Sequence, residues 1–295
     1  MINEKKILIT GKDSYIGNSV KEWLMSCEQY DIVDEVCVKG SQWREMDFSS
    51  YDAVFHVAGI AHSDVGNASE EIKSLYYQVN TDLTVEVAKK ARLAGVGQFI
   101  FMSSMIVYGD SAPFDTMKQI TRLTSPSPAN FYGDSKLQAE VGLSDLKSDD
   151  FKVAIIRPPM VYGKGSKGNY PRLAKLAKKL PLFPDVENER SMIHIDNLCE
   201  FIRLVIGNVD EGIFYPQNAQ YVKTSEMVAA IAKVHGKNLR LTKRVNSFLK
   251  VFSKRFGIVN KVFGNLSYEM TLSAYKDHYQ VRSFEESIRL TEEIN

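Results

Sequence analysis

Residues 7–17 read ILITGKDSYIG, and this stretch decides the fold. The apolar run KILIT predicts a buried strand that ends at Gly11, and the residues after the turn have the apolar spacing of a helix. A helix that starts at such a turn can present its free N–H groups to a pyrophosphate. Gly11 permits the tight turn and Gly17 permits close helix–strand packing, whereas Ser14 occupies the place of the expected middle glycine. The two glycines alone are also typical of an ordinary β–α turn.

Strand-like and helix-like segments alternate on the C-terminal side of this turn. Strands are predicted at 31–38, 53–57, 98–102 and 152–156, and helices at 16–26, 82–94 and 132–146. This alternation implies an α/β protein with a doubly wound parallel sheet covered on both faces. Beyond Arg157 the pattern changes to glycine- and proline-marked loops and mostly helical spacing. We expect a nucleotide-binding lobe at 1–160, to which 190–218 return, and a smaller, mostly helical substrate lobe from 161–189 and 219–295.

The composition is that of an ordinary globular protein. The chain has 295 residues, of which 44% are hydrophobic and 25% charged, and its formal net charge of +1 gives no indication of nucleic-acid binding. Cys27, Cys37 and Cys199 lack the spacing of a zinc site or a disulfide framework, so we expect no metal and a reducing compartment. Residues 1–6 lack the apolar core of a signal peptide and no apolar run reaches membrane-spanning length, so the expected location is the cytoplasm.

Three polar residues form a candidate catalytic group. Tyr132 and Lys136 are four residues apart on a predicted helix and therefore share one face. Ser104 comes directly after a predicted strand, and ligands of doubly wound sheets bind at the carboxyl ends of strands. An ammonium near Tyr132 would lower the phenol pKa from its usual value of about 10 and let it exchange a proton with a sugar hydroxyl or ketone. Ser104 would hold the same oxygen. A lone Tyr-x-x-x-Lys pair is equally typical of a solvated surface.

At this point the chain resembles the extended short-chain dehydrogenase/reductases, in particular their nucleotide-sugar epimerases and reductases. The matching stretches include ITGKDSYIG, FHVAGIAH, FYGDSKLQAE, VAIIRPPMVYGKGSKGNY and RSMIHIDNL, in family order over roughly residues 7–198. The resemblance implies a Rossmann fold with Ser104, Tyr132 and Lys136 as the catalytic trio. Asn80 stands at the family's asparagine position, or is a helix-start residue. Residues 105–265 also resemble bacterial capsule and O-antigen enzymes that act at C4 of a UDP-N-acetyl-hexosamine.

The residues after the second strand indicate which nicotinamide cofactor is used. NAD-binding sites of this type carry an acid there, which bonds the ribose 2′-hydroxyl. Here Cys37 and Val38 are followed by Lys39, and Lys12 lies in the glycine turn. Two lysines suit a 2′-phosphate, so we expect NADP(H), with NAD as the alternative because Lys39 is also typical of a solvated loop. The expected cofactor contacts are Gly11, Lys12, Ser14, Tyr15, Ile16, Gly17, Lys39, Asp47, Ala58 and Lys136; Asp47 is either an adenine contact or a turn cap.

The resemblance also implies where a UDP-sugar would bind. Asn169 and Arg190 match the positions that contact the uridine diphosphate, and a guanidinium offers a planar fork to phosphate oxygens. Arg190 is alternatively a surface ion-pair partner of Glu187 or Asp196. His62 is a further candidate substrate contact, while His56 and His194 have the apolar neighbours of packed strand residues.

The two residues after Ser104 narrow the range of reactions. Dehydratases of this family carry an Asp-Glu pair there, where this chain has Met105 and Ile106. Two reactions at C4 of the sugar remain, reduction of a 4-keto sugar by NADPH and epimerisation through a tightly held NAD⁺. We favour a 4-reductase of a UDP-4-keto-6-deoxy-N-acetyl-hexosamine in surface polysaccharide biosynthesis. A UDP-hexose or UDP-N-acetyl-hexosamine 4-epimerase is the alternative, and a catalytically silent sugar-nucleotide-binding protein is the alternative of another class.

Two further expectations concern assembly. The family's dimer-forming helices imply a homodimer with contacts at Leu83, Val87, Leu137 and Val141, unless these side chains face their own sheet. Residues 243–266 (KRVNSFLKVFSKRFGIVNKVFGNL) have phenylalanines and lysines at helical spacing, as in a helix that lies weakly on an anionic membrane surface. Our default expectation is that this apolar stripe packs into the substrate lobe.

Overall fold

The computed structural model describes residues 5–61, 68–113, 115–253 and 257–293. The chain divides into two units, of which the first contains residues 1–109, 125–158 and 198–216. The second contains residues 110–124, 159–197 and 217–295. Residues 110–124, 159–160, 190–197 and 217–218, which were expected in the nucleotide-binding lobe, belong to the second unit.

The first unit is built on a six-stranded parallel sheet with the order β10-β6-β4-β3-β1-β2. The strands are β1 (Lys5–Thr10), β2 (Tyr30–Val36), β3 (Ala53–His56), β4 (Gln98–Met102), β6 (Lys152–Ile156) and β10 (Gly212–Phe214). The chain runs outward from β1 to β2 and then returns to the other side of β1 with β3. The strand order therefore reverses between β1 and β3, which is where doubly wound sheets bind ligands. The predicted fold class is confirmed.

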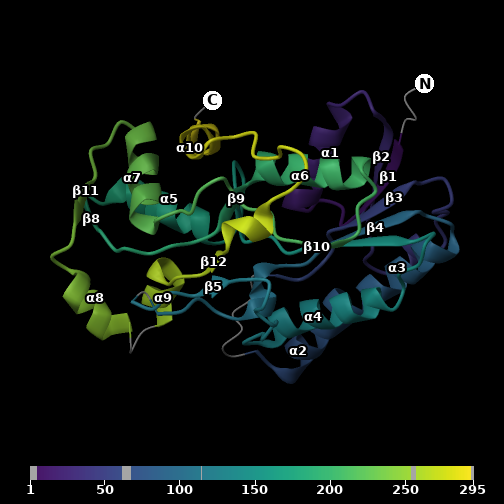
Figure 1. The fold of residues 1–295 in the computed structure, drawn as a ribbon, viewed down its shortest axis with the longest axis horizontal. Helices are drawn as coiled ribbons and strands as arrows, with labels where there is room; N and C mark the ends of the chain where they lie inside the picture. The colour runs from purple at the N-terminus through teal and green to yellow at the C-terminus, as the bar shows by residue number, and fades with distance from the viewer. Residues whose placement is uncertain (1–4, 62–67, 114, 254–256, 294–295) are drawn as a thin grey trace. The chain divides into compact units, whose positions relative to one another are not determined.

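Helices cover both faces of this sheet (Figure 1). One face carries α1 (Tyr15–Met25) and α6 (Ile195–Gly207), and the other carries α2 (Glu70–Tyr77), α3 (Leu83–Leu93) and α4 (Phe131–Ser144). The core between sheet and helices is apolar, as the predicted strands required, and includes Leu8, Val54, Val87, Phe99 and Leu143.

The sequence prediction missed the start of one helical segment. Helix was predicted from residue 82, but α2 begins at Glu70 and leads through one π-helical turn, η3 (Gln78–Asp82), into α3. Ser69 caps α2 by accepting a hydrogen bond from the backbone N–H of Ile72 (3.4 Å). Such π turns are rare in helices and are frequent at functional sites.

The second unit combines short strand pairs with helices. β7 (Met160–Tyr162) pairs with β9 (Met192–His194), β8 (Leu182–Pro184) with β11 (Arg240–Thr242), and β5 (Gln119–Ile120) with β12 (Ser267–Tyr268). The helices are α5 (Asn169–Lys179), α7 (Thr224–Val234), α8 (Asn246–Ser253), α9 (Gly257–Phe263) and α10 (Phe284–Glu292). Leu173, Met227, Ile231 and Ile288 lie in its core.

The basic amphipathic stretch is not one continuous helix. It forms α8 and α9, and residues 254–256 lie outside the described residues. Leu249, Val259 and Val262 pack against the core of the second unit and Phe263 is buried in it, while Phe248 is 62% exposed. The apolar stripe is thus largely used inside its own unit. None of the described helices is long and apolar enough to cross a membrane.

The four expected dimer contacts have different environments. Val87 is fully buried in the core of the first unit and Leu83 packs against that core, so these two face their own sheet. Leu137 is half-buried, whereas Val141 is 54% exposed on α4. The expectation is therefore wrong for Val87.

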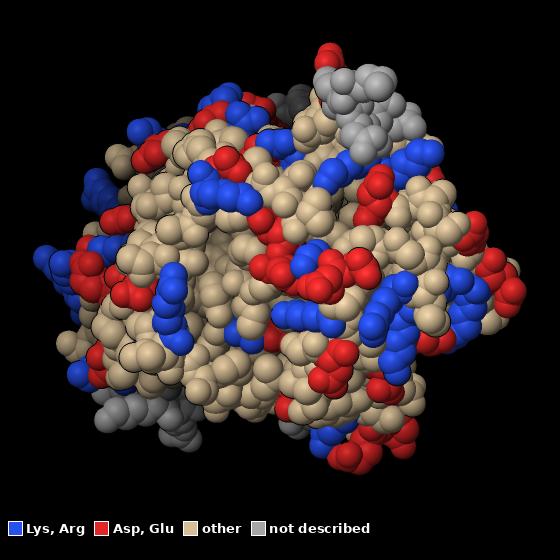
Figure 2. Space-filling model, turned by 45° about the vertical axis from the view of Figure 1, so that its right-hand side comes forward, with Lys and Arg blue, Asp and Glu red and all other residues tan. Residues whose placement is uncertain are grey.

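On the face that Figure 2 presents, basic and acidic side chains are interspersed, in keeping with the small net charge.

Candidate active site

The glycine turn lies at the point where the strand order reverses. Gly11 has φ 111°, and a Cβ there would lie 2.8 Å from the backbone nitrogen of Ala58, which comes after β3. Only glycine fits this approach. Ser14, which departs from the glycine pattern, is the N-cap of α1, because its Oγ accepts a hydrogen bond from the Gly17 N–H (3.0 Å). The bare backbone of the turn, at the N-terminus of α1, fits a dinucleotide.

The end of β2 borders the same turn. The N–H groups of Gly11 and Lys12 donate to the Val36 carbonyl (3.1 and 3.4 Å), and the strand ends at that residue. Cys37 and Lys39, like Lys12, are exposed, and residues 37–40 contain no acid. Asp47 is used locally, since its carboxylate accepts from the N–H and Oγ of Ser49 (2.8 and 2.9 Å). These hydrogen bonds lower the pKa of Asp47. Asp47 therefore caps a local turn.

Ser104 and Tyr132 are brought together by two local features of α4. The Asn130 side chain caps the helix by accepting from the N–H groups of Tyr132 and Gly133 (both 3.1 Å). A Cβ at Gly133 would lie 2.7 Å from the carbonyl oxygen of Ile106, so glycine lets α4 approach the 3₁₀ turn η4 (Met105–Tyr108) that Ser104 caps. Sequence reasoning missed both residues, although Gly133 lies inside the quoted FYGDSK motif.

The ionisation of Tyr132 differs from the prediction. Burial raises the pKa of Tyr132 to about 12, and a side-chain hydrogen bond with Ser104 offsets part of that rise. The ring packs edge-on against Tyr76, with centroids 5.9 Å apart. The predicted lowering of this pKa is not found in this structure, because the effect of burial is the larger one. The phenol is therefore protonated across the neutral range.

Lys136 is buried close to the same site. Its Nζ donates to the carbonyl of Met102 (3.0 Å) and lies 4.7 Å from the centroid of the Phe101 ring. Burial lowers the pKa of Lys136 to about 8, and the charge of Glu140 raises it in part. A Cβ at Gly59 would lie 3.1 Å from this Nζ, so a larger residue would crowd the ammonium group.

Asn80 is fully buried at the π-helical turn. Its Oδ1 accepts from the Ile60 N–H (2.8 Å), and its Nδ2 donates to the Ile60 carbonyl (3.1 Å) and to Ser135 Oγ (3.0 Å). The π turn directs this side chain inward, and the amide fixes the loop after β3 to α4. Asn80, at the family's asparagine position, thus connects the loop after β3 to α4 close to the three candidate catalytic residues.

Of the three candidate histidines, His56 and His194 have structural surroundings. His56 is fully buried between the hydroxyls of Thr10 (2.6 Å) and Thr84 (3.0 Å), and burial lowers its pKa to about 3. The proposed substrate contact His62 lies outside the described residues.

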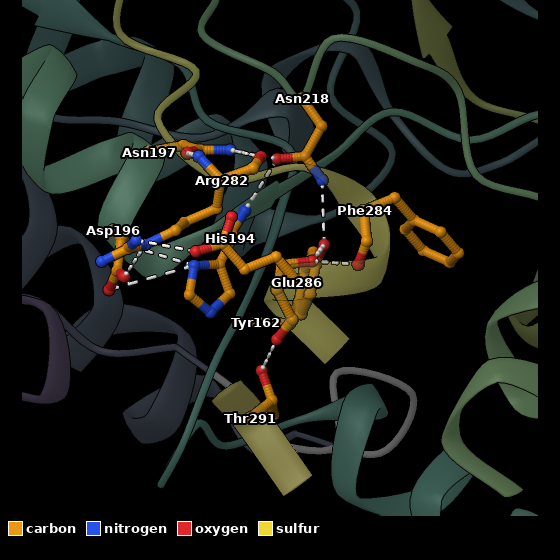
Figure 3. Close-up of polar contacts among 10 residues, drawn as sticks. Tyr162, His194, Asp196, Asn197, Asn218, Arg282, Phe284, Glu286 and Thr291 are labelled. Carbon is orange, nitrogen blue, oxygen red and sulfur yellow. Dashed lines mark hydrogen bonds and ion pairs between the residues drawn. The ribbon is translucent and has the colours of Figure 1, made fainter. Parts of the chain in front are cut away.

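His194 belongs to the polar network of the second unit (Figure 3). Its N–H donates to Asn218 Oδ1 (3.0 Å), its Nδ1 accepts from the Asp196 N–H (3.3 Å), and Arg282 Nε donates to Asp196 Oδ2 (2.8 Å). Burial lowers the pKa of His194 to about 4. The network fixes the segment before α10 to the end of β9.

The two expected uridine diphosphate contacts both lie in the second unit. Asn169 is exposed at the start of α5, after Gly168 with φ 95°. Arg190 caps the end of α9, because its Nη1 donates to the carbonyl of Lys261 (2.8 Å). The ion pairs suggested for Arg190 are absent among the described residues, since Glu187 pairs with Lys223 and Asp196 with Arg282. Those residues also contain no cluster of three or more potential metal ligands.

Comparison with known proteins decides the family. The model described as the NAD dependent epimerase/dehydratase family matches residues 7–215. The chain belongs to this family. It is 30% identical to a UDP-glucose 4-epimerase of Vibrio cholerae over 90% of this chain and 88% of that relative. As a family member it is a nicotinamide-dependent enzyme of nucleotide sugars, of the epimerase and reductase type.

Solved structures of two kinds have the same fold. A UDP-glucuronic acid 4-epimerase from Bacillus cereus in complex with NAD superposes with a TM-score of 0.71 and 17% identity, covering 97% of each chain. A dTDP-4-dehydrorhamnose reductase from Bacillus anthracis in complex with NADP superposes with a TM-score of 0.68 and 18% identity, covering 98% of each chain. The same fold therefore occurs in an epimerase that binds NAD and in a reductase that binds NADP.

Proposed function

We propose that this epimerase/dehydratase family member is a 4-reductase that uses NADPH to reduce a UDP-4-keto-6-deoxy-N-acetyl-hexosamine. The observation that carries the proposal is the end of β2, where exposed Lys39 and Lys12 stand and an acid is missing. A carboxylate there would repel a 2′-phosphate, whereas ammonium groups attract it. A freely exchanging NADPH supports net reduction rather than the closed redox cycle of an epimerase.

The trio supports proton donation to the reduced oxygen. The cofactor supplies a hydride when bound. Tyr132, protonated at neutral pH, donates its proton to the sugar O4, and Ser104 donates a hydrogen bond to the same oxygen. The positive charge of Lys136 stabilises the phenolate that remains. At neutral pH the phenol holds the proton that a reductase must deliver to the substrate oxygen.

The residues after Ser104 argue against dehydration. Met105 is buried and Ile106 is half-buried in η4, so these positions hold apolar side chains in place of a carboxylate pair. Neither side chain can remove or deliver a proton.

The UDP moiety is proposed to contact Asn169 and Arg190. The site of action is proposed to be the cytoplasm.

A 4-epimerase is the second candidate, because the Vibrio cholerae relative, which is similar to this chain over most of its length, is a UDP-glucose 4-epimerase. A turnover assay separates the two. The purified protein is given NADPH and a UDP-4-keto-6-deoxy-N-acetyl-hexosamine, and separately UDP-N-acetylglucosamine without added cofactor. The reductase consumes NADPH in the first assay and leaves the second substrate unchanged. Interconversion of UDP-N-acetylglucosamine and its C4 epimer by bound NAD would contradict the proposal in favour of the epimerase.

A further inference from the structure

A buried ion pair lies under the active site, and the proposed chemistry does not use it. Glu140 on α4 and Arg157, which comes after β6, bind through Arg157 Nη2 and Glu140 Oε2 (2.5 Å), and their side chains are only 4% and 5% exposed. Arg157 Nε donates to both carboxylate oxygens (3.1 and 3.2 Å). Desolvation of two charges makes such a pair a poor source of stability by itself. Its position therefore calls for a functional explanation.

The pair connects the segments that carry the trio. Ser103, next to Ser104, donates its hydroxyl proton to Glu140 Oε1, and its N–H donates to the carbonyl of Ile156 (2.8 Å). Arg157 Nη1 donates to the hydroxyl of Tyr108 (2.6 Å) at the end of η4. The Glu140 carboxylate and the Arg157 guanidinium thus connect four segments, which are the ends of β4 and β6, the turn η4 and the helix α4.

The charge of Glu140 also acts on Lys136, one helical turn before it on α4. The groups around Lys136 are Tyr132 on the same helix, His56 on β3, Asn80 in η3 and the Met102 carbonyl on β4. Tyr132 and His56 are uncharged at neutral pH, since their pKa values are about 12 and about 3. Glu140 is the neighbour whose charge raises the pKa of Lys136 against the effect of burial.

We propose that Glu140 and Arg157 are positioning residues of the active site. Arg157 fixes the Glu140 carboxylate; Glu140 holds the Ser103–Ser104 turn against α4, and its negative charge keeps Lys136 in the ammonium form. The inference rests on the proposed role of Lys136 in the reaction. It adds that the charge of Glu140, which is held at the end of the sheet by Arg157, affects the protonation of Lys136.

The test measures the ionisation of Lys136 directly, without substrate. The full chain is labelled with ¹³C at lysine Cε, the Lys136 signal is assigned with Lys136→Met, and the signal is followed by NMR as the pH rises. Glu140→Gln should lower the Lys136 pKa by about one unit, a tenfold loss of proton affinity. The alkaline limb of the turnover profile should move down with it. Glu140→Asp keeps the charge and should restore most of the wild-type value.

Two further variants separate charge from structure. Ser103→Ala removes a hydrogen bond to the carboxylate but no charge, so it should lower turnover while leaving the Lys136 pKa unchanged. The double variant Glu140→Gln/Arg157→Met replaces the ion pair with a neutral pair, so that folding is preserved if the single variant unfolds. It should still lower the Lys136 pKa.

The inference is overturned if Glu140→Gln or the double variant changes only the melting temperature and leaves the Lys136 titration in place. Failure of the proposed function gives a different result. In that case wild-type protein would not reduce the 4-keto sugar, while the NMR titrations would still respond to Glu140.

Discussion

Two buried groups of the active site have opposite displacements of their pKa values. Burial raises that of Tyr132 to about 12 and lowers that of Lys136 to about 8. Both shifts favour the neutral form, because a charge is costly where water is excluded. At neutral pH the result is a protonated phenol beside an ammonium group that is close to losing its proton. The protonated phenol carries the proton that the reduction of a ketone requires.

The phenol of Tyr132 gives the first prediction. Tyr132→Phe should lower turnover by about 10²–10⁴-fold, because the proton donor is lost, while cofactor affinity stays nearly unchanged. Steady-state kinetics and a fluorescence titration with NADPH measure the two quantities. Near-normal turnover of Tyr132→Phe would remove the proposed acid.

Cofactor choice gives the second prediction. Lys39→Asp should weaken NADPH binding about ten- to hundredfold, because a charge-assisted contact becomes a repulsion, and should favour NADH. Lys89→Asp, at an exposed position on α3, is the matched control and should leave both affinities unchanged. Equal affinities of the wild-type protein for the two cofactors would contradict this assignment.

The places of Ser104, Tyr132 and Lys136 in the fold were predictable, because their spacing and their strand-end position carry a signal in sequence. Their ionisation was not, because the pKa of Tyr132 depends on how deeply the fold buries it. In the sequence, Ser14 is a departure from the glycine pattern. Its role as a helix cap becomes visible only with the geometry of α1. Arg190 matched a phosphate-binding position, yet its guanidinium caps α9, which no local pattern could indicate.

At the scale of elements, β3 and β9 each bury a neutral histidine. The pKa values of His56 and His194 are lowered to about 3 and about 4 from an ordinary value of 6.5. The unfolded chain therefore binds more protons than the folded one between these values, so stability present above about pH 6.5 is lost as the pH falls.

This linkage gives the third prediction, on stability against pH. The free energy of unfolding should fall by about 2 kcal/mol per histidine between about pH 7.5 and about pH 5, a range above the titration of most carboxylates. Urea unfolding at the two pH values measures it. His56→Asn cannot titrate and should show a smaller difference between the two pH values. An unchanged free energy of unfolding in the wild-type protein would contradict the buried neutral histidines.

The elements of the sheet were predictable from periodicity, and β4 and β6 have the predicted limits. The exceptions have physical causes. The helix α2 has only 8 residues, and the π turn after it depends on the contacts of Asn80 rather than on propensity. In the stretch 243–266 the helical spacing of apolar residues continues past Gly257, which predicted one helix. In the structure a second helix, α9, begins at Gly257.

At the scale of the molecule, α2 and α4 pack together and expose apolar side chains. Ile72 and Leu75 on α2 are 42% and 46% exposed, and Val141 on α4 is 54% exposed. A contiguous apolar patch, if these side chains form one, is typical of an interface.

The fourth prediction is therefore a homodimer through this face. Light scattering at micromolar concentration should give twice the chain mass, and Val141→Asp should shift the population to monomer. Met25→Asp, at a position on α1 that is 64% exposed, is the control that should leave the mass unchanged. A wild-type protein with the mass of a single chain would count against the interface.

The most direct test of the proposed reduction traces one hydrogen atom. NADPH that carries deuterium at nicotinamide C4 is supplied with a UDP-4-keto-6-deoxy-N-acetyl-hexosamine, and the product is analysed by NMR and mass spectrometry. We expect one deuterium at C4 of the sugar in each product molecule, with one NADPH consumed. A product whose C4 hydrogen does not come from the added cofactor, or a C4 epimer formed without net NADPH consumption, would contradict the reductase assignment.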